Sequence, residues 1–160
     1  SCDAKSFDCW ADWQTAGDAG TKIHIVYANR DNVPGIRYVY LDTSDGSVGG
    51  DDLIETCQGT GVFRTSEGIL YAMVSITKTR GGNLAVAIKY EDSDSVLFHS
   101  FYTSPDADTW TSKPGLYEDN EDYCLLFPGN EADNQDVWGI YWNASANEIS
   151  LKTFDNSGIS

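Results

Sequence analysis

Short runs of β-favouring residues divide the chain, and polar turn residues separate each run from the next. Apolar residues nowhere recur at the spacing of an amphipathic helix. Val, Ile, Tyr and Phe instead alternate with polar residues or form short continuous runs. The clearest runs are Ile23–Tyr27, Ile36–Leu41, Leu53–Cys57, Ile69–Ile76, Leu84–Tyr90, Val96–Tyr102, Tyr123–Phe127, Val137–Trp142 and Glu148–Phe154. About ten short strands without helices predict an all-β fold, which is a sandwich, a barrel or a propeller.

Three predicted hairpins share a layout that narrows this choice. They are Ile23–Ser44, Leu84–Ser104 and Val137–Ser157. In each, an apolar strand ends in Tyr or Tyr-Trp, a polar turn follows, and an alternating strand closes on a small polar cluster with Ser. A period of about 50 residues with four strands per unit is typical of β-propeller blades, which bury their faces against neighbouring blades. We therefore predict one domain, 1–160, with approximate repeats at 7–58, 62–118 and 122–160.

The four strands of a unit are easiest to assign in the middle repeat. Its inner strand is predicted at Ile69–Ile76, and a short outer strand is predicted near Gly115–Tyr117. The first repeat requires Phe7–Trp13 as its inner strand. The third repeat has no outer strand, so the sequence predicts about three antiparallel blades, of which the last is incomplete.

The segment after the third strand of the middle repeat carries a family resemblance. Its residues Ser104-Pro105-Asp106-Ala107-Asp108-Thr109-Trp110 resemble the Asp-box, or bacterial neuraminidase repeat, of sialidase-like propellers, whose pattern is Ser-x-Asp-x-Gly-x-Thr-Trp. One residue of the pattern is missing here, and Asp108 stands where glycine or its neighbour belongs. Weaker remnants lie at Asp42–Gly46 and Asp155–Gly158. With the repeat period, the resemblance covers most of the chain.

The resemblance implies structural roles for this segment. In that family the Asp-box is the turn between the third and fourth strands of a blade, where the Asp accepts backbone hydrogen bonds and the Trp packs between blades. Propellers usually have about four to eight blades. Three blades therefore need either the rest of a longer chain or self-association to close the ring. The residues expected to be structural rather than catalytic are Ser104, Asp106, Thr109 and Trp110.

Charge excludes several classes of partner. The chain carries 10 basic and 25 acidic residues, which gives a formal net charge of −15. Nucleic acids and anionic lipid surfaces are negatively charged, so the average surface of this chain repels both. No run of about 18 apolar residues is present, and we expect no membrane insertion.

The four cysteines allow more than one arrangement. They are Cys2, Cys9, Cys57 and Cys124, and none of them forms a Cys-x-x-Cys pair. A zinc site is therefore not expected. An even number permits two disulfides in an oxidising compartment, and we prefer Cys2–Cys9 with Cys57–Cys124. Four reduced, buried thiols are the alternative.

The sequence gives little support for glycoside hydrolase activity. A sialidase clamps the substrate carboxylate with three arginines, whereas this chain has only Arg30, Arg37, Arg64 and Arg80, in predicted turns and a strand. Other glycoside hydrolases need only two carboxylates at a set separation, and 25 acidic residues always supply some such pair. We predict no catalytic residue, and a glycoside hydrolase of sialidase-like fold is the alternative.

Acidic residues gather in three predicted turns, Glu91–Asp94, Glu118–Asp122 and Glu131–Asp136. The usual role of such clusters is a solvated loop surface. Closely spaced carboxylates also bind calcium, but none of these turns has the spacing and glycine of an EF-hand loop. We predict no cofactor, with Ca²⁺ as the alternative, and leave the metal unassigned.

Aromatic residues give the last class of candidates. Sugar rings stack on Trp and Tyr, and Trp138 and Trp142 share one face of a predicted strand because side chains alternate with a period of two. Packing between blades is the competing role. Candidate ligand-binding residues are Trp138, Trp142 and Tyr117. The sequence thus favours a non-enzymatic extracellular, cell-surface or virion-associated module, such as a phage structural protein, for assembly or for glycan and host-surface recognition.

Overall fold

The structure is a computed structural model that describes residues 7–29, 35–57, 72–91, 96–114 and 121–154, with side chains omitted at 121–124. Within these residues the chain is all-β, as predicted, with three antiparallel sheets and one short 3₁₀ turn, η1 (Asp12–Gln14). No helix in the described part is long and apolar enough to cross a membrane.

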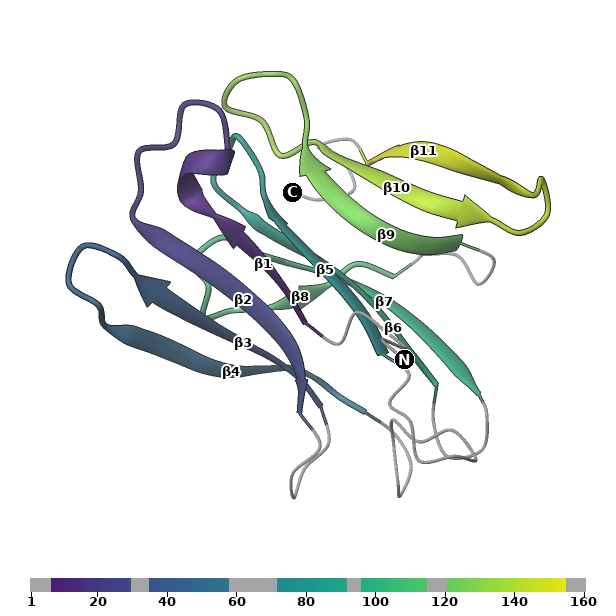
Figure 1. The fold of residues 1–160 in the computed structure, drawn as a ribbon, viewed down its shortest axis with the longest axis horizontal. Helices are drawn as coiled ribbons and strands as arrows, with labels where there is room; N and C mark the ends of the chain where they lie inside the picture. Colours follow the sequence, from purple (N-terminus) through teal and green to yellow (C-terminus); the bar gives the residue numbers. More distant parts are fainter. Residues whose placement is uncertain (1–6, 30–34, 58–71, 92–95, 115–120, 155–160) are drawn as a thin grey trace.

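Each sheet is a meander in which consecutive strands pair (Figure 1). The first sheet contains β1 (Phe7–Ala11), β2 (Lys22–Asn29), β3 (Gly35–Asp42) and β4 (Val48–Thr56). The second contains β5 (Ala72–Lys78), β6 (Leu84–Glu91), β7 (Leu97–Ser104) and β8 (Thr111–Ser112). The third contains β9 (Glu121–Pro128), β10 (Val137–Asn143) and β11 (Glu148–Phe154).

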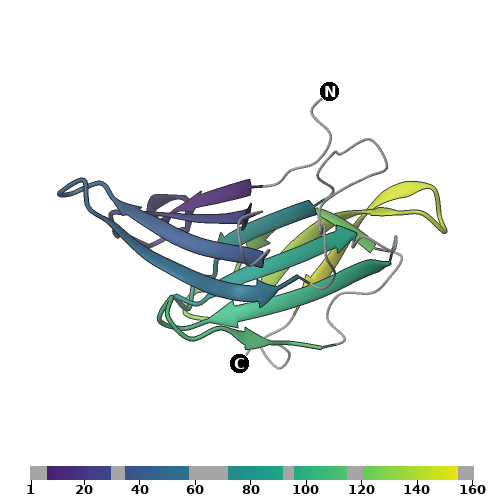
Figure 2. The same ribbon diagram turned by 90° about the horizontal axis from the view of Figure 1, so that it is seen from below.

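The second sheet is covered on both faces. Strand β6 is buried at every position from Leu84 to Tyr90, which explains why its sequence is a continuous apolar run around a single Lys89. Because side chains alternate across a strand, its even-numbered residues face one neighbouring sheet and its odd-numbered residues face the other. Figure 2 shows the second sheet between the purple-to-blue first sheet and the yellow β10–β11 hairpin.

The larger core lies between the first and second sheets. The second sheet contributes Val74, Ile76 and the even-numbered side chains of β6, and the first sheet contributes Val26, Ile36 and Tyr38. All of these side chains are almost completely buried. Burial of this apolar area is the main force that holds the two sheets together.

The smaller core lies between the second and third sheets. Small side chains at Ala85 and Ala87 of the second sheet leave room for Leu126 and Phe154 of the third sheet. The ring centroids of Phe101 and Phe154 lie 4.9 Å apart in a tilted arrangement. Large side chains therefore fill the space above small ones at this contact.

The first strands of the three sheets lie side by side, with β5 in contact with both β1 and β9 (Figure 1). They are linked by side chains rather than by a backbone ladder. The Asp8 carboxylate accepts hydrogen bonds from the Ser75 hydroxyl and from the Ile76 N–H, both at 3.0 Å. The Ser75 hydroxyl in turn accepts the Leu126 N–H at 3.0 Å. Side chains thus satisfy amide donors at the edges of β5 and β9.

Connections between strands also tie neighbouring sheets together. The Thr15 hydroxyl, in the β1–β2 connection, donates to the Lys78 carbonyl at the end of β5. The Gly81 N–H, in the β5–β6 turn, donates to the Asn134 carbonyl in the β9–β10 connection at 2.6 Å. Each sheet is therefore fixed to the next at the same end of its first hairpin.

Three of the strand predictions need comment. Strand β1 ends at Ala11 instead of Trp13, because the chain turns into η1 and the Gln14 side chain accepts the Ala11 N–H. Strand β4 begins at Val48 rather than Leu53, since a bulge opposite Tyr38 and Val39 accommodates the positive φ of Gly50 and Asp51. The outer strand of the second sheet is β8, whereas the prediction near Gly115–Tyr117 lies outside the described residues.

The preferred disulfide pairing is not present. Cys9 and Cys57 both carry free thiols, and each of the pairs Cys2–Cys9 and Cys57–Cys124 requires one of them. Cys9 is exposed, whereas Cys57 is buried in the core between the first two sheets. Burial raises the pKa of the Cys57 thiol to about 12, so that thiol is protonated at neutral pH. Cys2 and the side chain of Cys124 lie outside the described part.

Ser75→Ala should destabilise the chain. The buried Leu126 N–H loses its acceptor, and the Asp8 carboxylate loses the hydroxyl that donates to it. A buried unsatisfied donor costs about 1–3 kcal/mol, and urea unfolding followed by circular dichroism measures this loss. Ser145→Ala, in an exposed turn, is the control and should stay within about 0.5 kcal/mol of the wild type. Equal stability of the two variants would contradict the linking role of Ser75.

Candidate functional site

The outward face of the third sheet is an apolar surface. Strand pairing places Ile140 opposite Leu125 and Leu151, and it places Trp142 opposite Ile149. Directly opposed residues lie on the same side of a sheet. We call this surface the third-sheet face, and its apolar side chains are Leu125, Phe127, Trp138, Ile140, Trp142, Ile149 and Leu151. Phe127 packs against Trp10 of the first sheet, and the register places one acidic residue, Asp122, opposite Trp142.

Four of these side chains are open to solvent. The exposed fraction is 42% for Leu125, 40% for Trp142, 74% for Ile149 and 61% for Leu151. The opposite side of the same sheet is buried against the second sheet. An antiparallel sheet with one solvated face normally carries polar residues there. A contiguous apolar face is instead typical of an interaction surface.

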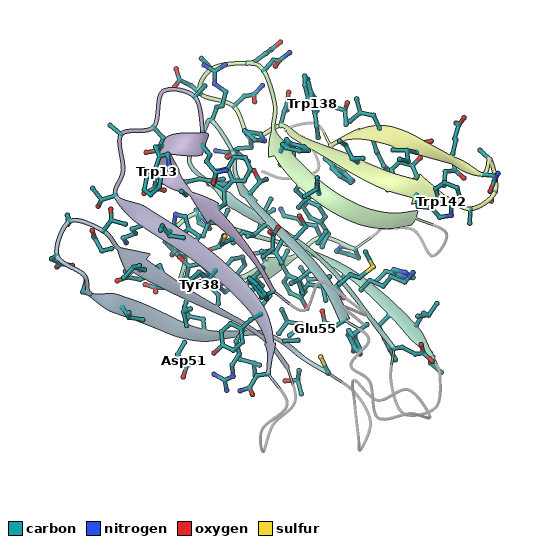
Figure 3. All side chains as sticks on the ribbon, viewed as in Figure 1. Trp13, Tyr38, Asp51, Glu55, Trp138 and Trp142 are labelled. Carbon is teal, nitrogen blue, oxygen red and sulfur yellow. The ribbon has the colours of Figure 1, made fainter. Side chains whose placement is uncertain are left out.

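The two predicted tryptophans both belong to this surface (Figure 3). Trp142 is exposed and Trp138 is half-buried, and both side chains lie on the side of β10 away from the second sheet. Trp13, on η1 of the first sheet, is also exposed, at 55%. Tyr117, the third candidate for ligand binding, lies outside the described residues. The predicted placement of both tryptophans on one face of the strand agrees with the register, and the structure adds the aliphatic side chains around them.

The Ser104–Trp110 segment forms a turn closed by its own polar atoms. The Asp106 carboxylate accepts the N–H groups of Asp108 at 3.0 Å and Thr109 at 2.8 Å. The buried Ser104 hydroxyl accepts the Ala107 N–H at 2.8 Å. These backbone hydrogen bonds hold the pKa of Asp106 below its usual range, so its carboxylate stays ionised as an acceptor.

Trp110 follows this turn and packs against the first sheet. Its ring centroid lies 5.3 Å from that of Tyr38, at an interplanar angle of 57°. Tyr38 lies on β3 and is completely buried. Trp110 therefore contributes to packing between the first two sheets, and this contact accounts for its position.

A buried polar cluster lies at the junction of the first two sheets. His24 Nδ1 lies 2.6 Å from the Tyr38 hydroxyl, and His24 Nε2 lies 2.9 Å from Asp12 Oδ1. The Lys78 ammonium group donates to the same Asp12 oxygen at 2.6 Å and pairs with Asp18 at 2.8 Å. The Lys22 N–H donates to the other Asp12 oxygen at 2.9 Å.

The protonation states of this cluster follow from its geometry. Burial acts to raise the pKa of Asp12, but hydrogen bonds from Lys78, Lys22 and His24 outweigh it and the pKa is lowered. Burial lowers the pKa of His24 despite the neighbouring carboxylate. Neutral His24 then donates from Nε2 to Asp12 and accepts the Tyr38 hydroxyl at Nδ1.

The residue types of this cluster are those of a proton relay, but the Tyr38 hydroxyl is not accessible to a substrate. Burial, followed by the charge of Tyr40, raises the pKa of Tyr38 far above its usual value, so the phenol stays protonated. Its oxygen is enclosed and already donates to His24. A nucleophile or general base must reach its substrate directly or through one water. We therefore assign the cluster a structural role in joining the first and second sheets.

One cavity opens beside the cluster. It has a volume of about 140 Å³ and is lined by Lys22, His24, Lys78 and the turn Ser104–Ala107. Ligand pockets usually enclose about 300–1,000 Å³. The cavity has room for a few waters but not for a sugar ring.

The described arginines do not form a carboxylate clamp. Arg37, on β3, pairs with Asp51 at 2.8 Å. Arg80 donates to the Asn130 carbonyl in the connection of the third sheet. Arg30 and Arg64 lie outside the described residues. The two arginines that are described are engaged at different places, so they do not approach one shared substrate group.

No cluster of three or more His, Cys, Asp or Glu side chains in the described part has the geometry to hold a metal ion. The acidic turn Glu131–Asp136 is organised by Asn134, whose side-chain amide donates to Asp136 at 2.9 Å. The turns Glu91–Asp94 and Glu118–Asp122 lie largely outside the described residues.

The sequence analysis did not identify the polar cluster around His24. The other members of the cluster come from η1, β3 and β5, and Asp12 and Lys78 are 66 residues apart in the chain. The available signal was the period-two pattern, because His24 shares its side of β2 with the buried Val26. That pattern predicts burial, but it does not identify Asp12 or Lys78 as partners.

Comparison with known proteins gives no match: no family model matches the chain, and neither a curated protein nor a solved structure matches it.

His24 should make stability depend on pH. The pKa of His24 is lower in the folded chain than its unfolded value of about 6.5, so the folded state disfavours the proton. The contribution of neutral His24 to folding stability is complete above pH about 6.5, and it is lost as the pH falls toward the folded pKa. We expect the free energy of unfolding to decrease between pH 7 and 5.

The matched variants are His24→Gln and His99→Gln, because these are the two histidines of the chain. Urea unfolding at several pH values should show a flatter profile for His24→Gln, while His99→Gln keeps the His24 step. If His24→Gln retains the wild-type slope between pH 7 and 5, the assigned protonation of the cluster is wrong.

Proposed function

We propose that this chain is a non-enzymatic β-propeller module, extracellular or on a cell surface or virion, that serves structural assembly or the recognition of surface glycans. The observation that supports it best is the third-sheet face, an exposed apolar surface with two tryptophans. Side chains of this kind gain free energy when a partner removes them from water.

The propeller arrangement is supported by the order of the strands. Each sheet is a meander that starts from a first strand, and the three first strands β1, β5 and β9 lie together. Each sheet also packs one face against the next one, as blades do. The hydrogen bonds around Asp106 agree with the role that the Asp-box has in sialidase-like propellers.

Three blades leave two open ends in such a ring. A longer chain or further copies of this chain would cover them, because an unpaired blade face exposes apolar area to water. Assembly is therefore part of the proposed function rather than an addition to it.

Glycan recognition is supported by Trp142. Its indole is exposed, and the apolar face of a sugar ring can stack on it. Asn143 ends β10 and Ser145 lies in the adjacent β10–β11 turn, and both carry side chains that can bond sugar hydroxyls.

The non-enzymatic assignment rests on the polar cluster and the arginines. Every oxygen or nitrogen that would have to react at the cluster is engaged in the described structure, and the adjoining cavity is small. We therefore expect no turnover of a fluorogenic sialoside by the wild-type chain.

Trp142→Ala should weaken partner binding by at least about tenfold, because a large buried aromatic contributes about 1.4 kcal/mol or more at an interface. Retention on a glycan array and self-association in light scattering are both measured. Trp13→Ala is the control, since Trp13 is an exposed tryptophan on another sheet. Sialoside hydrolysis by the wild type, or a wild type that neither binds glycan nor associates, would refute the proposal.

A further inference from the structure

The β10–β11 hairpin contains the acceptor sequence of a covalent modification. Asn143-Ala144-Ser145 has the pattern Asn-x-Ser/Thr without proline in the middle, which is the pattern that N-linked glycosylation requires. No other asparagine of the chain is followed two positions later by Ser or Thr. The pattern by itself is common in turns, so the geometry around Asn143 decides whether a glycan fits there.

The turn of this hairpin lies at a free end of the third sheet. The inner side of β10, which packs on the second sheet, is buried at Val137 and Gly139 but only half-buried at Tyr141 and Asn143. Every residue of 144–149 is exposed. In Figures 1 and 2 the turn projects beyond the strands of the other two sheets. An oligosaccharide on Asn143 therefore extends into solvent rather than into a neighbouring sheet.

The turn itself orients the Asn143 side chain. Its Oδ1 accepts the N–H groups of Ser145 and Ala146, both at 3.1 Å. This is an Asx-turn, in which the side-chain oxygen points into the turn. Because the amide group is planar, its Nδ2 is directed away from these two N–H groups, and it donates no hydrogen bond within the described part of the chain. The nitrogen that would carry the sugar is therefore not engaged there.

Tyr141 lies two residues before Asn143, on the same side of β10. Residues rise by about 3.3 Å along a strand, so the two side chains start about 7 Å apart. Tyr141 packs on the core between the second and third sheets but is only half-buried, which leaves part of its side chain open to solvent. The first sugar on Asn143 can place its apolar C–H face on this ring.

From these observations we infer that Asn143 is the acceptor of an N-linked glycan and that the first sugar of this glycan packs on Tyr141. The inference rests on the extracellular location that is part of the proposed function, because the donor of such a glycan is a lipid-linked oligosaccharide of the export pathway.

The transfer is a substitution at the anomeric carbon of the first sugar. A bond forms between that carbon and Nδ2 of Asn143, and the bond from the carbon to the pyrophosphate of the lipid carrier breaks. The lipid pyrophosphate leaves with the electron pair of the broken bond, and the amide nitrogen gives up one of its two protons. The reaction requires no oxidant or reductant.

The glycan starts on the side of β10 opposite to the proposed recognition surface. Asn143 lies on the inner side of the strand, whereas Trp142 lies on the third-sheet face. Modification removes the Asn143 side chain from the groups that could bond a recognised sugar, and it leaves the Trp142 indole on its own face. The modification and the proposed recognition can therefore be tested separately.

Secretion of the full chain from a eukaryotic cell line, behind a cleavable leader, tests the acceptor. Intact mass is measured before and after treatment with peptide N-glycosidase, and peptide mapping locates the asparagine that this enzyme converts to aspartate. The wild type should lose the mass of one oligosaccharide, with the conversion at Asn143. Asn143→Gln and Ser145→Ala should show no loss, while Ser145→Thr keeps the acceptor pattern and should be modified like the wild type.

Stability measurements test the contact with Tyr141. The wild type made in bacteria carries no glycan, and the secreted wild type trimmed by an endoglycosidase keeps only the first sugar. Urea unfolding should show a higher midpoint for the trimmed form. The difference between the two forms should persist in Tyr141→Phe, which keeps the ring, and disappear in Tyr141→Leu. If Tyr141→Leu does not fold, the wild-type pair decides the contact alone.

Three results would overturn the inference. A secreted wild type without a mass loss, in cells that glycosylate a control protein, shows that Asn143 is not an acceptor. A mass loss that persists in Ser145→Ala means that the acceptor pattern is not what directs the modification. Equal midpoints of the trimmed and the bacterial wild type show that the first sugar does not pack on Tyr141.

Failure of the proposed function gives a different result. The glycan array and light scattering use the bacterial wild type, which has no glycan, so their outcome does not depend on Asn143. A chain that is modified at Asn143 but neither binds glycan nor associates would refute the proposed function and leave the acceptor site in place.

Discussion

Hydrogen bonds made by the side chains of Asp8 and Ser75 hold the first strands of the three sheets next to one another without joining the sheets. The first strands β1, β5 and β9 lie side by side, and edge strands at such a distance tend to pair into one continuous sheet. The Asp8 carboxylate accepts the Ile76 N–H of β5, and the Ser75 hydroxyl accepts the Leu126 N–H of β9. These edge donors are satisfied without a backbone ladder, so each sheet is free to turn its face toward its neighbour.

The two-sided burial of the second sheet follows from this separation. One side of β6 packs on the first sheet and the other side packs on the third, and the two apolar cores have no member in common. The polar cluster around Asp12 adds an electrostatic tie at one end of the larger core. The outer sides of the first and third sheets also carry exposed apolar side chains, among them Phe7, Val48, Ile149 and Leu151.

Local pattern was sufficient to predict most strands, because each depends on its own alternation of side chains. The segments Ile23–Tyr27 and Leu84–Tyr90 lie inside β2 and β6. The start of β4 was missed because Gly49 and Gly50 have low β propensity, and the bulges that admit them depend on β3. The ion pair of Asp12 with Lys78 and the link from Asp8 to Ser75 were also missed, since both join segments distant in the sequence. Trp138 and Trp142 were found by period, but the aliphatic surface around them required the pairing register.

Hydrogen exchange of two backbone amides tests the linked first strands most directly. Ile76 and Leu126 donate to side chains instead of to a neighbouring strand, so simple edge amides at these positions would exchange quickly with solvent. The structure predicts that both amides are protected to a degree close to that of the amides in β6. Rapid exchange of Ile76 and Leu126, while β6 stays protected, would show that the three sheets are not joined in this way.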